Sequence, residues 1–195
     1  MSILPIINDV GLRPLKQRRA SLCHRARGRV LDLGIGTGLN LLAYPTVDSV
    51  IGVDTSEQML AVARARALAC RYPVVLARHA AEAMPFEDGE FDTVVSTFAL
   101  CSVQDPAAVA REIRRVLSPD GLFLFLEHVR SPDPQLRRWQ ERFRWPWGKL
   151  LGGCDPSRDV VGAIRQAGLR IVELEEFDGR WLPLVRPHVM GAATR

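Results

Sequence analysis

One segment near the amino terminus joins an apolar run to three regularly spaced glycines: Val30-Leu31-Asp32-Leu33-Gly34-Ile35-Gly36-Thr37-Gly38. A short apolar run that ends in glycine is typical of a buried β-strand followed by a tight turn. Glycine permits the positive φ angles of such a turn and lets a ligand approach the backbone closely. The segment therefore predicts a strand over 29–33, a ligand-binding loop, and a short helix over 39–44.

The rest of the chain alternates β-branched runs with longer runs rich in alanine, arginine and leucine. This alternation predicts an α/β fold with a parallel sheet. Five strands are expected in the first two thirds of the chain, over 29–33, 49–54, 74–78, 91–98 and 122–129. Two helices are expected between them, over 56–71 with Ser56 as cap and over 106–117 with Asp105 as cap. A Ser-Pro-Asp-Gly turn over 118–121 should end the second helix.

The last third of the chain differs in composition. Residues 131–154 contain three of the four tryptophans, Trp139, Trp145 and Trp147. They predict either a lid over an apolar substrate pocket or a helix that packs its aromatic side chains against the sheet. A helix over 155–167 should follow. Two strands over 169–177 and 185–192, joined through Asp178-Gly179 and Pro183, should close the chain as a hairpin.

Composition limits the classes of protein to consider. The chain has 195 residues, 47% of them apolar and 25% charged, which fits one globular domain. Its apolar runs are far shorter than the about 18 residues that cross a bilayer, and no signal peptide is recognisable, so we expect a cytoplasmic protein without an integral membrane segment. The cysteines form no CxxC pair, which predicts neither a disulfide framework nor a metal site, only apolar packing. They are Cys23, Cys70, Cys101 and Cys154.

Many of the basic residues lie before residue 30, although the net charge of +4 is mild. Such a segment is usually the solvated face of a helix. The alternative is a non-catalytic nucleotide-binding module that docks on RNA or an anionic membrane through this segment. No RNA-reading aromatic motif accompanies the basic residues, so we expect a small-molecule partner and no nucleic acid, with peripheral membrane contact left open.

Two aspartates indicate which ligand the glycine loop binds. Asp54 ends the second strand 20 residues after Gly34, the offset at which a carboxylate reaches ribose hydroxyls. The third glycine, Gly38, comes one residue too early for the dinucleotide pattern GxGxxG. Asp32 would repel a pyrophosphate and attract an ammonium or sulfonium group. These features favour S-adenosylmethionine over NAD; the alternative is a tight turn without a ligand.

At this point the chain resembles the class I S-adenosylmethionine-dependent methyltransferases. The resemblance rests on the glycine loop, on Ile51-Gly52-Val53-Asp54, on the run over 81–92, and on the turn over 115–121, where relatives more often have a glycine in place of Asp120. It implies a Rossmann-like three-layer α/β/α fold whose seven-stranded, mostly parallel sheet has an antiparallel last strand. The single domain 1–195 would comprise a helical segment (1–28), a cofactor-binding core (29–129), an aromatic insert or lid (130–154), and a last helix with a hairpin (155–195).

The same resemblance implies which residues contact the cofactor. Asp32 would orient the amino group of the methionine part, directly or through the loop, and Asp54 would hold the ribose. Thr55 and Met59 would border the adenine. Relatives often carry an acidic residue for the adenine amino group where this chain has His79-Ala80, so backbone groups or His79 would take that role. The expected cofactor contacts are Asp32, Gly34, Gly36, Gly38, Asn40, Asp54, Thr55, Met59, His79, Ala80, Ala81 and Thr97.

A narrower resemblance concerns the methyl acceptor. Leu100-Cys101-Ser102-Val103, Glu127-His128-Val129 and Val185-Arg186-Pro187-His188-Val189 are similar to segments of the small-thiol S-methyltransferases. This implies in-line methyl transfer to hydrogen sulfide or an alkyl thiol, with no metal. N-, O- or C-methylation of another small metabolite, such as a phospholipid amine or a quinone precursor, remains open.

Four polar residues are candidates for contact with the acceptor. Glu127 and His128 are expected at the end of the fifth strand, where ligands of open α/β sheets gather. Arg186 and His188 alternate along one expected strand and so share a face. Histidine or arginine there would stabilise a thiolate. Each of the four has a structural alternative, as a group hydrogen-bonded to a neighbouring loop or to a sheet edge.

Overall fold

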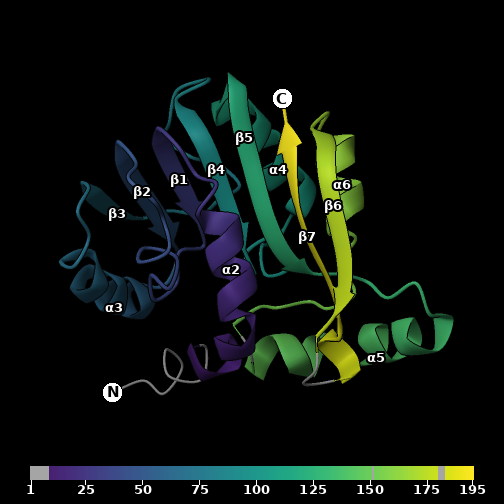
Figure 1. Ribbon diagram of the computed structural model, residues 1–195. Helices are drawn as coiled ribbons and strands as arrows, with labels where there is room; N and C mark the ends of the chain where they lie inside the picture. The colour runs from purple at the N-terminus through teal and green to yellow at the C-terminus, as the bar shows by residue number, and fades with distance from the viewer. Residues whose placement is uncertain (1–8, 151, 180–182) are drawn as a thin grey trace.

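A seven-stranded sheet forms the centre of the protein (Figure 1). The computed structural model describes residues 9–150, 152–179 and 183–195. The strands are β1 (Arg29–Leu33), β2 (Ser49–Asp54), β3 (Val74–Arg78), β4 (Phe91–Thr97), β5 (Leu117–His128), β6 (Arg170–Asp178) and β7 (Pro187–Thr194). They lie in the order β3-β2-β1-β4-β5-β7-β6, and only the pairings of β7 are antiparallel. The expected sheet, mostly parallel with an antiparallel last strand, is confirmed.

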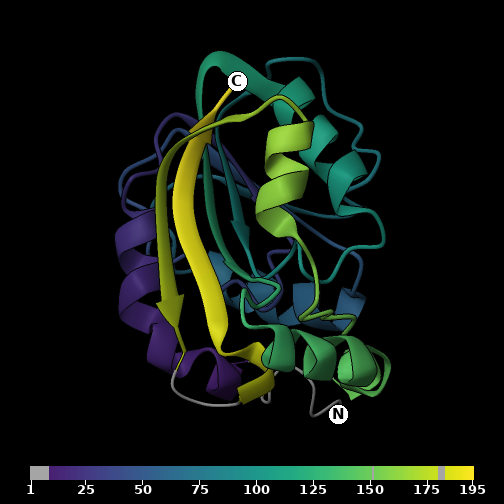
Figure 2. The same ribbon diagram turned by 90° about the vertical axis from the view of Figure 1, so that its right-hand side faces the viewer.

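Helices cover both faces of this sheet. They are η1 (Arg13–Leu15), α2 (Lys16–Cys23), α3 (Glu57–Ala67), α4 (Pro106–Val116), α5 (Pro134–Leu150), α6 (Val160–Gln166) and η2 (Pro183–Val185). The edge-on view shows α4 and α6 together on one face and α2 on the other (Figure 2). α5 lies beyond the carboxyl ends of the parallel strands (Figure 1). The three layers match the architecture that the resemblance implies.

The two faces of the sheet have separate cores. Leu31 of β1 packs with Ile113 of α4 in one buried cluster. Its neighbour Val30 packs with Leu22 of α2 in the other. Successive side chains of a strand point to opposite faces, so a strand buried on both faces must be apolar at nearly every position. This explains the continuous apolar runs of the central strands.

The strand order reverses between β1 and β4. From β1 the chain proceeds outward to β2 and β3, whereas β4 is followed in the sheet by β5 on the opposite side. In open α/β sheets, ligands bind outside the carboxyl ends of the strands at such a reversal. The glycine loop follows β1 directly, so the topology places it at this point.

Both predicted helix starts are confirmed. The Ser56 side chain accepts a hydrogen bond from the backbone N–H of Met59 at the start of α3. The Asp105 side chain accepts hydrogen bonds from the backbone N–H groups of Ala107 and Ala108 at the start of α4. Capping of this kind satisfies donors that have no partner within the helix.

Three local predictions were wrong. Residues 39–43 form turns rather than a helix, and the side chains of Asn40 and Tyr44 bind Asp32 instead. β5 begins at Leu117, so the segment over 118–121 belongs to an irregular start of the strand and is not a turn. α6 begins only at Val160, because the Asp155 carboxylate binds the backbone N–H and hydroxyl of Ser157. The residues 180–182 between β6 and η2, within the predicted hairpin connection, lie outside the described residues.

The basic amino-terminal segment is tied to the sheet where the structure describes it. Arg18 and Arg25 form ion pairs with Glu175 and Glu173 of β6, at 2.6 and 2.7 Å. The guanidinium of Arg18 also lies 3.9 Å from the ring centre of Phe177. Exposed ion pairs contribute little to stability individually, but together they fix where α2 lies. Residues 1–8 of the expected helical segment lie outside the described part.

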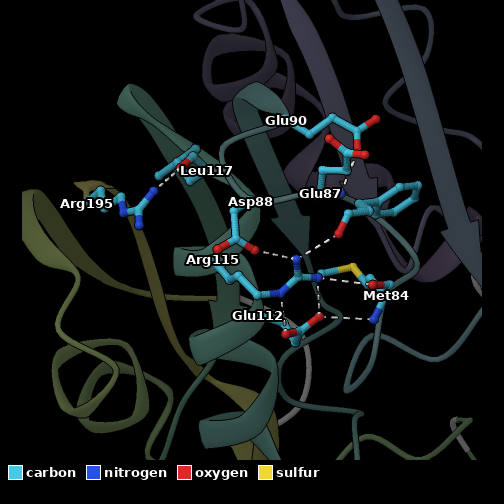
Figure 3. A network of polar contacts seen from close by, with 9 residues as sticks. Met84, Glu87, Asp88, Glu90, Glu112, Arg115, Leu117 and Arg195 are labelled. Atoms are coloured by element: carbon cyan, nitrogen blue, oxygen red, sulfur yellow. Dashed lines mark hydrogen bonds and ion pairs between the residues drawn. The ribbon is translucent and has the colours of Figure 1, made fainter.

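Arg115 of α4 anchors the segment that leads into β4 (Figure 3). Its guanidinium donates hydrogen bonds to the carboxylates of Glu112 and Asp88 and to the backbone carbonyls of Met84 and Phe86. Both carboxylates raise the pKa of Arg115. One side chain thus satisfies two backbone acceptors of a segment that has no regular structure.

Within the described residues, no helix is both long and apolar enough to cross a membrane.

Candidate active site

A cavity of about 620 Å³ opens at the carboxyl ends of β1 and β4. One side of it is formed by the glycine loop, the end of β2 and the segment over 79–82. The other side is formed by residues 97–104, by the end of β5, and by residues from α5 and from the start of β7. We call the first the nucleoside end and the second the acceptor end.

Most of the expected cofactor contacts line this cavity. The members that do so are Gly34, Gly36, Asn40, Asp54, Thr55, Met59, His79, Ala80, Ala81 and Thr97. Asp32 and Gly38 do not. Asp32 is fully buried beneath the loop. Gly38 has a φ of +80°, and a Cβ there would lie 3.2 Å from the Cα of Ala63 in α3, so its role is to let the loop pack against that helix.

The conformation of the glycine loop depends on positive φ angles and on hydrogen bonds to its backbone. Gly34 and Gly36 have φ angles of +60° and +56°. A Cβ on Gly34 would lie 2.6 Å from the Cβ of Ala99 after β4. Asp54 accepts hydrogen bonds from the backbone N–H of Gly36 at 2.9 Å and from that of Ser56 at 2.8 Å. Asp54 therefore fixes the loop as well as lining the cavity.

Asp32 acts on the cavity through Asn40. The Asn40 amide group donates to both carboxylate oxygens of Asp32 at 3.1 Å and to the hydroxyl of Thr97 at 3.0 Å, and the Tyr44 hydroxyl donates to Asp32 at 2.8 Å. Burial raises the pKa of Asp32 to about 7, although these hydrogen bonds oppose the shift. Asn40 is thereby oriented, and its Oδ1 is buried without a partner among the described residues. That oxygen is an acceptor available to a ligand.

Arg19 of α2 is a cavity residue that the sequence analysis missed. Its side chain is buried, and its Nη1 has no hydrogen-bond partner in the described part of the chain. Burial lowers its pKa, but an arginine stays charged at neutral pH. A signal was available: Leu15, Arg19 and Leu22 follow helical spacing, and all three are buried. An arginine within an apolar stripe is a candidate for ligand contact.

The start of the described chain also closes over the glycine loop. Asp9 accepts a hydrogen bond from the Thr37 hydroxyl at 2.6 Å and one from Arg66 of α3 at 2.5 Å. Arg66 donates in turn to the backbone carbonyl of Thr37. These contacts join three separate segments at the nucleoside end.

The acceptor end gathers two histidines, two cysteines and a strained phenylalanine. His128 and His188 lie with ring centres 4.6 Å apart, and Phe98 packs against both. Phe98 has a φ of +60°, a conformation that is costly for a bulky residue and is found mainly at functional sites. Burial, with His128 nearby, lowers the pKa of His188 to about 4, so its ring is neutral at pH 7.

The two cysteines at this end are Cys101 and Cys154. Their sulfur atoms lie 3.8 Å apart, and both are close to Nδ1 of His128. The hydrogen bond between the sulfur atoms lowers the pKa of Cys154, aided by His128, and raises that of Cys101. From the sequence, these cysteines were expected only to pack as apolar residues. The structure corrects this, because residues far apart in the chain meet at the sheet edge.

Glu127 does not line the cavity but fixes this end of it. Its buried carboxylate accepts hydrogen bonds from the Ser96 hydroxyl and from the backbone N–H groups of Ala99, Leu100 and Cys101, at 2.7 to 3.2 Å. Burial raises its pKa against the effect of these bonds. Glu127, which was expected to contact the acceptor, therefore positions the segment that carries Cys101.

Comparisons with known proteins show which family the chain resembles. A family model described as a methyltransferase domain matches residues 31–125. The thiol S-methyltransferase TMT1B of Homo sapiens is 34% identical over 99% of this chain and 84% of its own length. The phosphatidylethanolamine N-methyltransferase of Cereibacter sphaeroides is 36% identical over 75% of this chain and 77% of its own. The crystal structure of the YcgJ protein of Bacillus subtilis superposes with a TM-score of 0.68 at 27% identity, covering 87% of this chain and 74% of that one.

The chain belongs to the S-adenosylmethionine-dependent methyltransferases. This methyltransferase therefore uses S-adenosylmethionine and acts on a small molecule. Because the electrophile is already activated in the cofactor, the chain has mainly to align the nucleophile, the methyl carbon and the leaving sulfur.

Two expectations about the acceptor end of the methyltransferase differ from the structure. The Arg186 side chain is exposed and paired with Asp178 at 2.5 Å, and β7 begins only at Pro187. Arg186 therefore does not share the cavity face of His188. Of the tryptophans in the insert, only Trp147 lines the cavity, while Trp139 and Trp145 are exposed on α5. The residue Leu151 within the insert lies outside the described residues.

Proposed function

We propose that this methyltransferase transfers the methyl group of S-adenosylmethionine to hydrogen sulfide or a small alkyl thiol. The observation that carries the proposal is the composition of the acceptor end. Imidazole, thiol and aromatic groups gather there in His128, Cys101 and Phe98, while the nearby Glu127 carboxylate already accepts hydrogen bonds from the Ser96 hydroxyl and from three backbone N–H groups. Such surroundings accommodate a small, polarizable sulfur nucleophile. The likeness to TMT1B over nearly the whole chain supports the same acceptor.

The cofactor's methionine part has matching groups at the nucleoside end. The unpartnered Nη1 of Arg19 suits its carboxylate, and the unpartnered Oδ1 of Asn40 suits its ammonium group. Charge-assisted hydrogen bonds of this kind are stronger than neutral ones. Asp54 would accept from the ribose hydroxyls, and Thr55, Met59, His79, Ala80 and Ala81 would border the adenine. Gly34 and Gly36 would face the methionine part across the loop.

The reaction in this proposal is an in-line displacement. The acceptor sulfur forms a bond to the methyl carbon while the bond from that carbon to the sulfonium breaks, and the bonding electron pair remains on the departing sulfur. A thiol of pKa about 8.5 is already a few per cent thiolate at neutral pH. The thiol proton would pass to solvent, and His128 lies in the cavity where it would help to stabilise the thiolate. A strong catalytic base is not needed.

The insert over 130–154 contributes residues to the acceptor end of the cavity. Trp147 of α5 lines the cavity, and Gln140 of α5 binds the backbone of Ser131, Val129 and Leu184. Through these bonds α5 would act as a fixed cover over the acceptor end.

The basic segment before residue 30 is a poor candidate for docking on RNA or membranes, because Arg18 and Arg25 are already paired with β6.

A panel of acceptors tests the proposal. The purified chain would be incubated with methyl-labelled S-adenosylmethionine and, separately, with hydrogen sulfide, an alkyl thiol, a primary amine, a phenol, or phosphatidylethanolamine vesicles. We expect labelled product only with the sulfur acceptors. Arg186→Ala serves as a surface control that should leave the rates unchanged. Turnover of the amine, the phenol or the lipid without turnover of thiols would overturn the proposal.

A further inference from the structure

Three potential metal ligands meet at the acceptor end without a role in cofactor binding. The Sγ atoms of Cys101 and Cys154 lie 3.8 Å apart, and Nδ1 of His128 lies 3.9 Å from the first and 3.4 Å from the second. Each residue comes from a different segment: Cys101 follows β4, His128 ends β5, and Cys154 follows α5. All three line the cavity.

These separations match those of a tetrahedral zinc site. With Zn–S bonds of about 2.3 Å and Zn–N bonds of about 2.0 Å, a tetrahedron places its two sulfurs about 3.8 Å apart and each sulfur about 3.5 Å from the nitrogen. The observed triangle is within about 0.4 Å of these values on every side. A disulfide, by contrast, would need the two sulfur atoms to approach to about 2.05 Å.

The surrounding backbone holds this triangle in place. The carbonyl of Cys101 accepts a hydrogen bond from the backbone N–H of Asp155 at 2.8 Å, which joins the two cysteine-bearing segments. Gly153 has a φ of +98°, and a Cβ there would lie 3.0 Å from the carbonyl oxygen of Ser102. Only glycine therefore lets Cys154 approach so closely. Glu127 fixes the segment before Cys101 in the same way.

We propose that Cys101, Cys154 and His128 bind a zinc ion whose fourth position faces the cavity. Three protein ligands with one open position are the arrangement of catalytic zinc sites, whereas structural sites use four. Two thiolates balance the charge of the ion, so the occupied site is neutral and can be buried at low cost. A soft, sulfur-rich ligand set selects zinc over magnesium or calcium.

The open position gives this site a role that rests on the proposed thiol methylation. A thiol or hydrosulfide that coordinates there loses its proton to solvent, because zinc stabilises the thiolate. The bound sulfur then forms its bond to the methyl carbon as the carbon–sulfonium bond breaks, and the electron pair stays on the sulfur of S-adenosylhomocysteine. No oxidant or reductant is needed. The methylated product is a neutral thioether, a weaker zinc ligand than a thiolate, and so can leave.

Metal content and spectroscopy test the site independently of activity. The full chain, purified with reductant, would be analysed for zinc and then loaded with Co²⁺ after removal of the native metal. We expect about one zinc ion per chain, and a cobalt spectrum with a thiolate charge-transfer band and tetrahedral visible bands. Addition of an alkyl thiol should shift the visible bands as it enters the fourth position.

Matched variants locate the ligands. Cys101→Ser and Cys154→Ser should lose the charge-transfer band and bind zinc at least about a hundredfold more weakly, since removing a direct ligand costs more than the 10- to 100-fold typical of an outer-shell partner. Cys70→Ser, a partly buried cysteine outside the cluster, should keep both. Calorimetry with S-adenosylhomocysteine shows whether each variant is folded, because the nucleoside end does not involve these residues.

The outcomes separate this proposal from the proposed function. A folded, reduced wild-type chain that binds neither zinc nor cobalt would overturn the zinc site, and so would a Cys101–Cys154 disulfide that persists under reductant. Zinc binding without methylation of any thiol would leave the site standing and remove the proposed acceptor. Methylation of thiols at an undiminished rate by metal-free chain would keep the acceptor and remove the role of zinc.

Discussion

The nucleoside end and the acceptor end of the cavity are built in different ways. The nucleoside end is organised around the glycine loop and the end of β2, where Asp54 binds the backbone N–H of Gly36, and residues from α2, from α3 and from the segment over 79–82 complete it. The acceptor end comes from segments around Phe98, His128, Cys154 and His188 that only the sheet brings together. The expected cofactor contacts thus centre on one local motif, whereas the residues of the acceptor end come from scattered positions in the chain. Substitutions at the two ends should therefore have separable effects.

The largest effect is expected at Gly34 in the glycine loop, which packs against Ala99 after β4. Gly34→Ala forces an L-residue to a φ of +60° and drives its Cβ to 2.6 Å from that of Ala99. Strain and overlap together should lower the free energy of unfolding by about 2–4 kcal/mol in urea denaturation, and displacement of the loop should weaken binding of S-adenosylhomocysteine in calorimetry. Gly148→Ala is the control, because its Cβ would meet nothing closer than 3.5 Å. Equal binding by both variants would contradict the role of the turn.

The pH dependence of stability should report on Asp32 beneath the nucleoside end. Its pKa is raised in the folded chain to about 7, so the folded state holds a proton that the unfolded state releases. The free energy of unfolding should therefore fall as pH rises from about 4 to about 7, by at most about 4 kcal/mol from this group. Urea denaturation over this range would measure the slope. In Asp32→Asn the slope should be shallower; an unchanged slope would show that another group is responsible.

A smaller effect confined to the nucleoside end is expected from Arg19. Replacing it in Arg19→Met keeps much of the apolar stem and removes a charge-assisted contact worth about 2 kcal/mol, or roughly thirtyfold in Kd for S-adenosylmethionine. The KM for the acceptor should not change. The neighbour Arg18 pairs with Glu175 on the surface, so Arg18→Met should leave cofactor affinity almost unaltered. An increase in the KM for the acceptor in Arg19→Met would contradict the expected independence of the two ends.

The smallest effect should appear at the acceptor end. His188→Leu removes an imidazole that stacks with Phe177 and binds the carbonyl of Arg186 at 2.9 Å. We expect an increase of about tenfold in the acceptor KM, as typical for one altered pocket contact, with cofactor affinity retained. Steady-state kinetics and calorimetry on the same preparation would separate the two. Weakened cofactor binding in this variant would argue against two independent ends.

Much of the fold could be predicted because its signals are local. The strand over 29–33, the cap at Ser56 and the glycine loop each follow from neighbouring residues. Where local signals failed, a longer-range contact decided the outcome. The expected helix over 39–44 gives way to turns because Asn40 and Tyr44 bind the buried Asp32.

The candidate site could be predicted more fully at the nucleoside end than at the acceptor end, where only His128 and His188 of the four expected residues line the cavity. Sequence spacing led to Asp54 and the glycines, since their partners lie within the same stretch. It could not show that Cys154 meets His128, because the path of the insert is set by α5 and by its bonds to other loops. The assignment of Arg186 failed because strand alternation was extended past the true start of β7.

The position of β7 has a consequence for how the protein assembles. This strand, over 187–194, inserts between β5 and β6 and carries His188. During synthesis β1 to β4 can pair as they emerge, but β6 has no place in the sheet until β7 has been made. Non-local pairing of this kind is slow to form. The part of the sheet that carries His188 is therefore completed after the part around the glycine loop, and a chain that lacks β7 would lose β6 from the sheet while keeping β1 to β4.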